Sequence, residues 1–161
     1  MTEKEYNNCV NLYSDNVFRF ILKNIRNEED AKDVVQSAFE KLWLAREKVE
    51  TETSKSYLFT IAYHQMIDLI RKNNRFSKGA SLTNNEGFEK SMVDTRLTLN
   101  EALGKLNNLQ RSLVMLKDYE GYHYAEIGEI TGLSESQVRV YLHRARLQLR
   151  SYIVKPENVI D

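Results

Sequence analysis

The side chains best suited to bind nucleic acid gather near the C-terminal end of the sequence. Between Ser134 and Tyr152 there are four arginines against one acid, Glu135, although the 161-residue chain has no formal net charge. These arginines are Arg139, Arg144, Arg146 and Arg150. Arginine pairs in bidentate fashion with guanine or clamps phosphate oxygens, and a glutamine such as Gln137 can read adenine. The segment therefore predicts contacts to DNA.

A helix-turn-helix is predicted to position these side chains. A helix over residues 124–130 is followed by a turn that contains Gly132, and Ser134 with Gln137 forms a capping-box pattern at the start of the last helix. One side of that helix is apolar, with Val138, Leu142, Ala145 and Leu149. The other side presents Glu135, Ser136, Gln137, Arg139, Val140, His143, Arg144 and Arg146. The coincidence of turn, cap and basic face favours DNA binding over an ordinary amphipathic helix in a bundle.

A second basic segment surrounds a helix predicted from Tyr57 to Asn73. Its basic residues, against Asp68 alone, are Lys55, Arg71, Lys72, Arg75 and Lys78. A polar stretch without helical periodicity, residues 49–56, precedes this helix and is predicted to be a loop. Basic side chains beside aromatic rings are typical of surfaces that bind single-stranded nucleic acid. Tyr57, Phe59 and Tyr63 supply the rings, but aromatic residues at helical spacing are more often core, and we expect Phe59 to be buried.

An acidic segment lies between Glu28 and Glu50, with seven acidic and four basic residues. Within it, Asp33 and Gln36 are three residues apart on one helical face, directed away from the apolar stripe that includes Phe39. We expect both side chains to be exposed and available to a partner. The alternative is that they are ordinary solvated residues.

The chain as a whole is predicted to be all-α, because it has one proline, six glycines and apolar residues at helical spacing. We expect two small helical domains, residues 1–75 and 96–161, joined by a flexible linker, residues 76–95. The first helix is expected from Glu3 to Ile25, and the second from an N-cap at Asn27 to about Lys48. Two short helices, around residues 99–106 and 109–116, precede the helix-turn-helix.

The predicted linker is long enough to span two sites on DNA. Its 20 residues, fully extended, reach at most ~65–70 Å, which covers about 19–20 base pairs of duplex. As a free coil it would span only ~25 Å, so a surface must hold it extended. Its acids Glu86, Glu89 and Asp94 would suit a basic channel.

Several classes of function are disfavoured by what the sequence lacks. The single cysteine, Cys9, has no metal-ligand neighbour, and it is expected to be a small filler on the first helix. No nucleotide-binding glycine loop or nucleophile elbow is present, so we expect no cofactor, no metal and no enzyme activity. No apolar run approaches the ~20 residues that span a bilayer, and the N-terminus lacks a leader pattern. We therefore expect no membrane insertion and a cytoplasmic location.

Two stretches of the sequence resemble bacterial sigma factors of the sigma-70 family, in its extracytoplasmic-function branch. The run from Glu120 to Arg146, EGYHYAEIGEITGLSESQVRVYLHRAR, looks like the module that reads the minus-thirty-five promoter element. The run DAKDVVQSAFEKLW from Asp30 is similar to the helix that docks on the clamp helices of the polymerase β′ subunit. The run YLFTIAYHQMIDLIRK from Tyr57 resembles the element that recognises the minus-ten region.

The resemblance implies a function, partners and site residues. The implied function is to bind RNA polymerase core, at the β′ clamp helices and the β flap, and to direct it to promoter DNA; an anti-sigma factor is a further implied partner. The residues implied to bind core are Asp33, Gln36, Ser37 and Glu40. Those implied for minus-ten DNA are Thr53, Ser54, Lys55, His64, Arg71, Lys72 and Arg75. Those implied for minus-thirty-five DNA are Ser136, Gln137, Arg139, Val140, His143 and Arg144.

Two other functions stay open from the residues themselves. One is a stand-alone helix-turn-helix repressor or activator, which would bind duplex DNA strongly without polymerase. The other is a helical protein-interaction module, which would bind core without any promoter preference.

Overall fold

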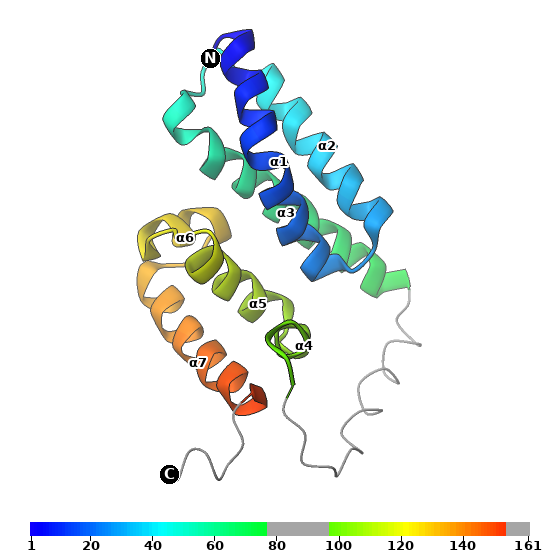
Figure 1. The fold of residues 1–161 in the computed structure, drawn as a ribbon, viewed down its shortest axis with the longest axis vertical. Coiled ribbons are helices and arrows are strands. Elements are labelled where there is room, and N and C mark those ends of the chain that lie inside the picture. The colour runs from blue at the N-terminus through cyan, green and yellow to red at the C-terminus, as the bar shows by residue number, and fades with distance from the viewer. Residues whose placement is uncertain (77–96, 154–161) are drawn as a thin grey trace.

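The computed structural model describes residues 1–76 and 97–153, and every regular element in these ranges is helical. Figure 1 shows two helical bundles, one formed by the blue-to-green N-terminal half and the other by the green-to-red C-terminal half. The predicted all-α class with two small helical domains is confirmed. The predicted linker, residues 76–95, lies outside the described residues apart from Phe76.

Three long helices form the N-terminal bundle. They are α1 (Glu3–Ile25), α2 (Glu28–Leu44) and α3 (Ser54–Phe76), with a short 3₁₀ helix, η1 (Thr51–Thr53), before α3. A capping box starts α1, because the Glu5 N–H donates to Thr2 Oγ1 at 3.1 Å and the Thr2 N–H donates to Glu5 Oε1 at 2.7 Å. Arg26 ends α1 in the left-handed region, at φ 62°. Asn27 then caps α2 as predicted, since its side chain accepts from the Asp30 N–H at 2.9 Å.

The apolar faces of these three helices meet in one core. Its fully buried members include Val17, Phe20, Ile21, Ala31, Ala38, Leu42, Leu58, Phe59, Ala62 and Met66. Phe20 and Phe59 pack edge to face with their ring centres 5.4 Å apart. The expectations that Phe59 is core and that Cys9 is a buried filler on α1 are both confirmed.

The start of α3 differs from the sequence prediction. Residues 49–56 were expected to be a loop, but η1 covers 51–53 and α3 begins at Ser54. Hydroxyl groups hold this first turn: Ser54 Oγ donates to the Thr51 carbonyl at 2.8 Å and Ser56 Oγ donates to the Thr53 carbonyl at 3.1 Å. Side-chain bonds of this kind leave no apolar periodicity, so the pattern did not reveal the helix.

The end of α2 also comes earlier than expected, at Leu44 rather than near Lys48. The Arg46 guanidinium lies 3.7 Å from the centre of the Trp43 ring and donates to the Trp43 carbonyl at 2.8 Å. This stacked arginine satisfies a carbonyl at the end of the helix.

Four short helical segments and one long helix form the C-terminal bundle. They are α4 (Leu99–Lys105), α5 (Asn108–Val114), the π-helical segment η3 (Met115–Tyr119), α6 (Tyr124–Thr131) and α7 (Glu135–Ile153). Capping boxes start the first two, Thr98 with Glu101 for α4 and Asn107 with Gln110 for α5. The core of this bundle includes Leu103, Leu106, Leu113, Met115, Leu116, Ile127, Ile130, Val138, Leu142 and Ala145.

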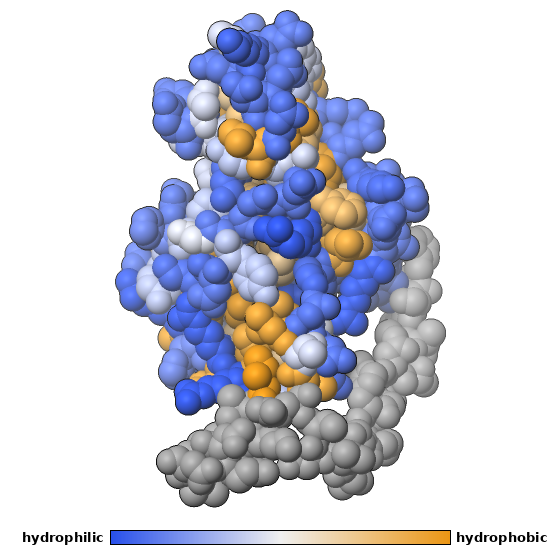
Figure 2. All heavy atoms as spheres, in the orientation of Figure 1, coloured by the Kyte–Doolittle hydropathy of each residue, from blue (hydrophilic) through white to orange (hydrophobic). Residues whose placement is uncertain are grey.

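The two bundles pack directly on one another, with α6 against α3 and α5 against α1. Figure 2 shows that the visible face is mainly hydrophilic over both bundles, with hydrophobic side chains gathered in a few patches. The helix-turn-helix therefore lies beside the helix that carries the second basic segment.

Candidate nucleic-acid and partner interfaces

The turn between α6 and α7 has the geometry of a helix-turn-helix. Gly132 adopts φ 83°, a left-handed conformation that favours glycine, and its N–H donates to the Gly128 carbonyl at 2.7 Å. Ser134 then starts α7, since its Oγ accepts from the Gln137 N–H at 3.1 Å and its own N–H donates to Gln137 Oε1 at 2.9 Å. The predicted turn and capping box are both present, and together they fix the direction of α7.

The two sides of α7 divide as the sequence predicted. Val138, Leu142 and Ala145 are buried, and Leu149 is partly buried against the core. The predicted groove-facing residues Ser136, Gln137, Arg139, Val140, His143 and Arg144 are all exposed. The helix thus presents a mainly polar and basic surface to solvent, interrupted by the exposed side chains of Val140 and Leu147.

Arg139 and Arg144 differ in how they are held. The Arg139 guanidinium lies 2.9 Å from Glu135 Oε2 and 4.2 Å from the centre of the Tyr124 ring. These contacts fix its direction near the N-terminal end of α7, where a major-groove helix meets base edges. Within the described residues, Arg144 has no ion-pair or hydrogen-bond partner, so its charge is free to meet a phosphate.

Two other polar residues of α7 are already engaged inside the domain. The Gln137 side-chain oxygen accepts the capping hydrogen bond from Ser134, so a bidentate contact to adenine would require that cap to open. Arg146 pairs with Asp118, with Nε 3.2 Å from Oδ2, and this hydrogen bond raises the pKa of Arg146. Arg146 therefore ties α7 to η3.

The basic end of α3 is accessible to solvent. His64, Arg71, Lys72 and Arg75 are all exposed. Arg71 lies 3.9 Å from Asp68, a loose exposed pair that a phosphate can displace at little cost. Thr53, just before α3, is also exposed, and its hydroxyl donates to the Glu50 carbonyl at 3.2 Å.

The first turn of α3 is not accessible in the same way. Ser54 is fully buried, with its Oγ 3.1 Å from Cys9 Sγ, because it begins the helix instead of lying in a loop. Nucleic acid cannot reach that hydroxyl in this conformation. The Lys55 side chain is 26% exposed and lies 3.2 Å from Glu120 of the C-terminal bundle.

The acid-rich side of α2 faces solvent. Asp33, Gln36 and Glu40 are exposed, as expected for a surface that meets a partner. Ser37 is only half-exposed, and its hydroxyl accepts from Gln65 Nε2 of α3 at 2.8 Å. Ser37 therefore supports the packing of α2 on α3.

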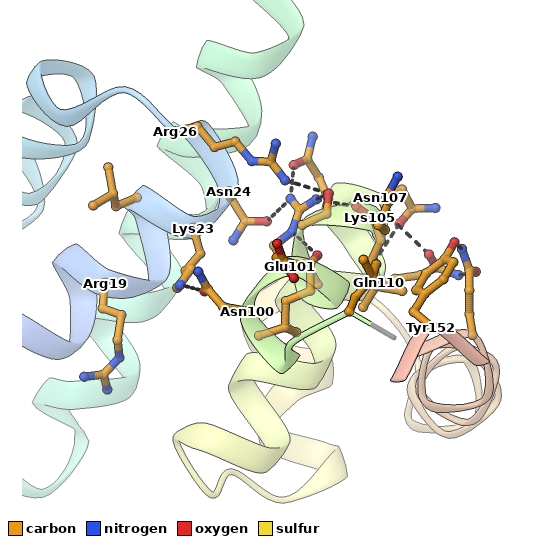
Figure 3. A pocket seen from close by; sticks show the side chains of 18 of the residues that line it. Arg19, Lys23, Asn24, Arg26, Asn100, Glu101, Lys105, Asn107, Gln110 and Tyr152 are labelled. Carbon is orange, nitrogen blue, oxygen red and sulfur yellow. Dashed lines mark hydrogen bonds between the residues drawn. The ribbon is translucent and has the colours of Figure 1, made fainter. Parts of the chain in front are cut away.

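Sequence reasoning missed the polar contacts between the bundles. Arg111 is buried on α5 and donates to Asn24 of α1, which is also buried. Nearby, the side chain of Arg26, just after α1, donates to the Gly104 carbonyl. A groove lies between α1 and α4, and Figure 3 shows Lys23 and Asn100 facing each other across it. The available signal was a charged residue, Arg111, within the apolar run around α5. Its partner Asn24 is 87 residues away in the sequence, so the spacing of residues does not reveal the contact.

The described part of the chain was searched for metal sites and for membrane-spanning helices. No group of histidine, cysteine or acidic side chains in residues 1–76 and 97–153 is arranged to hold a metal ion. In the same ranges, no helix is both long and apolar enough to cross a bilayer.

Comparison with known proteins matches both halves of the chain to one family. Residues 9–76 match Sigma-70 region 2, and residues 96–149 match Sigma-70 region 4. The sigma factor YlaC of Bacillus subtilis is 29% identical over 89% of this chain and 88% of its own length. SigV of the same organism is 29% identical over 92% of this chain and 91% of its own length.

A solved structure shares the fold. The sigma factor RpoE of Bartonella quintana, solved in complex with the anti-sigma factor NepR, has a TM-score of 0.74 and 22% identity over 92% of this chain and 96% of its own. With both sigma regions present in order, and with the helix-turn-helix in place, the chain belongs to the sigma-70 family of RNA polymerase sigma factors, in its extracytoplasmic-function branch.

Proposed function

We propose that this sigma factor holds RNA polymerase core through the exposed face of α2 and reads promoter DNA with two separate elements. Asp33, Gln36 and Glu40 would contact the β′ clamp helices, while the C-terminal bundle meets the β flap. The exposed residues of α3 would bind the minus-ten region, and the outer face of α7 would bind the minus-thirty-five element. The functional units would be residues 1–75 and 96–161, with 76–95 as the connection.

One observation carries this assignment. The acidic face of α2 stays exposed while the two bundles pack together, whereas α3 is covered in part by α6. Core polymerase can therefore engage α2 before the bundles separate and expose the remainder of α3 to DNA.

The assigned residues follow from accessibility. On η1 and α3 the proposed set is the exposed Thr53, His64, Arg71, Lys72 and Arg75, without the buried Ser54. Lys55 joins this set once its contact with Glu120 opens. On α7 it is Ser136, Arg139, Val140, His143 and Arg144, with Gln137 acting first as a cap. This work requires no catalysis, so the protein acts as a regulator rather than an enzyme, and it acts in the cytoplasm, where polymerase lies.

An anti-sigma factor is a further proposed partner. The structurally similar RpoE was solved with one, NepR. A protein that covers α3 or α7 would keep this chain from promoters.

A competition assay for core polymerase tests the α2 assignment. We expect Asp33→Ala with Gln36→Ala to lower the affinity for core about tenfold, since each removes an exposed polar contact to the partner. The matched control is Asn11→Ala with Asp15→Ala, which removes the same two kinds of side chain from exposed positions on α1. Equal affinity for core in the two double variants would contradict the assignment.

A further inference from the structure

A buried carboxylate joins the two bundles at one point. The Glu120 side chain, at the end of η3, is only 1% exposed. Its Oε1 accepts from Asn16 Nδ2 at 3.0 Å and lies 3.2 Å from Lys55 Nζ, and its Oε2 lies 3.5 Å from Arg19 Nη2. Three nitrogen groups of the N-terminal bundle therefore surround one acid of the C-terminal bundle. We call Asn16, Arg19 and Lys55 the anion cradle.

The chain around Glu120 is shaped to reach this cradle. Gly121 adopts φ 78°, so the backbone reverses directly after the acid. The N–H groups of Glu120 and Tyr122 donate to the carbonyls of Met115 and Leu116 at 2.9 and 3.0 Å, which fixes the reversal on η3. The Tyr122 ring then covers Lys55, with Nζ 5.4 Å from its centre, and packs on Phe59 at 5.8 Å.

We propose that the anion cradle binds a backbone phosphate of the unpaired promoter strand, and that Glu120 occupies this phosphate site while the bundles are packed. A phosphodiester, like a carboxylate, spreads one negative charge over two free oxygens, so it can take the same three donors. Lys55 is also within 6 Å of the Tyr13 and Phe59 rings, at 5.8 and 5.9 Å. Basic groups beside aromatic faces are typical of surfaces that hold single strands.

The balance of free energies allows a DNA phosphate to replace the Glu120 carboxylate in the anion cradle. Burying the Glu120 carboxylate beside two cations costs desolvation free energy, which roughly offsets the attraction between the opposite charges. These ion pairs therefore hold the bundles together only weakly. When the bundles separate, all of these groups regain water, and the cradle keeps two positive charges beside α3. The inference rests on the proposed function. It adds Asn16 and Arg19 to the DNA-binding surface, and it makes Glu120 an internal competitor of DNA.

Binding of a fluorescent oligothymidylate to the full-length protein tests the competition. We expect Glu120→Gln to bind the oligonucleotide about tenfold more tightly than the wild type, because one charged contact no longer competes. Its salt dependence should steepen by about 0.7 for the one phosphate gained. Glu129→Gln is the matched control, since it removes one exposed charge from α6 outside the cradle and should leave the affinity near that of the wild type. Equal gains in the two variants would overturn the inference.

A second substitution separates the cradle from other surfaces that opening exposes. Adding Arg19→Gln to Glu120→Gln should abolish the gain, with an unchanged thermal melt as the folding control. A gain that survives Arg19→Gln would show that the phosphate binds elsewhere and would also overturn the inference. Initiation by wild-type holoenzyme is measured in parallel, and an absence of initiation would count against the proposed function instead of the cradle.

Discussion

Arg111 on α5 donates through Nη1 to Oδ1 of Asn24 on α1 at 3.2 Å, so a buried guanidinium links the two bundles. The same group donates to the carbonyls of Leu103, Gly104 and Leu106 at the end of α4. Burial lowers the pKa of Arg111 to about 10, which leaves it charged at neutral pH. The carbonyls at the C-terminal end of α4 stabilise that charge.

Arg111→Met should therefore destabilise the protein. Methionine fills much of the same space but donates no hydrogen bond, so the carbonyls around it lose their donor. We expect the free energy of unfolding in urea to fall by about 2–4 kcal/mol. Arg150→Met, the same change at an exposed position of α7, should have an effect within about 0.5 kcal/mol. If the two variants unfold at the same urea concentration, Arg111 does not have this structural role.

Tyr122→Phe should strengthen the packed arrangement. The Tyr122 hydroxyl is buried and has no hydrogen-bond partner among the described residues, and burial is the main cause that raises its pKa. Removing a buried hydroxyl without a partner should favour the packed state by about 1 kcal/mol. Energy transfer between dyes on Asn8→Cys and Ser151→Cys reports the packed population, and it should increase.

The control for this experiment is Tyr119→Phe, because Tyr119 is 40% exposed and its hydroxyl has access to water. Its packed population should equal that of the wild type. A fall in the packed population of Tyr122→Phe would mean that the hydroxyl stabilises the interface after all.

Arg139 and Arg144 should have different roles on α7. Glu135 and Tyr124 hold Arg139 near the start of the helix, so we expect it to contact a base edge. Arg139→Ala should cost about 1–3 kcal/mol of binding and relax the preference at one or two promoter positions. Arg144 should grip a phosphate, so Arg144→Ala should weaken all sequences alike and lower the salt slope by about 0.9.

The measurement is initiation from a randomised upstream element over a series of salt concentrations, with holoenzyme assembled from each variant. Arg150→Ala, on the same helix but far from its N-terminal end, is the control and should keep the wild-type base preference. An unchanged base preference in Arg139→Ala at every position would show that Arg139 does not read DNA.

Much of the fold could be predicted from local sequence patterns. The Asn27 cap, the Gly132 turn and the buried face of α7 were all predictable, because each depends on residues within one or two helical turns. The first turn of α3 was not, since hydroxyl-to-carbonyl bonds such as that of Ser54 leave no apolar repeat.

The contacts between the bundles were beyond the reach of such patterns. Glu120 meets Asn16 at a separation of 104 residues, and nothing in the spacing of either residue indicates the other. For the same reason the sequence indicated for Lys55 only a contact with minus-ten DNA, whereas the structure pairs it with an acid of the other bundle. Knowledge of how the two domains pack is needed to see that pairing.

Transcription in vitro tests whether this protein directs RNA polymerase to promoters. Core polymerase is incubated with a library of promoters, with and without this protein, and the start sites are sequenced. We expect initiation that depends on the protein, at sites that share two sequence elements with a fixed separation. If the protein binds core or duplex DNA but yields no protein-dependent start sites, it does not act as a promoter-directing sigma factor.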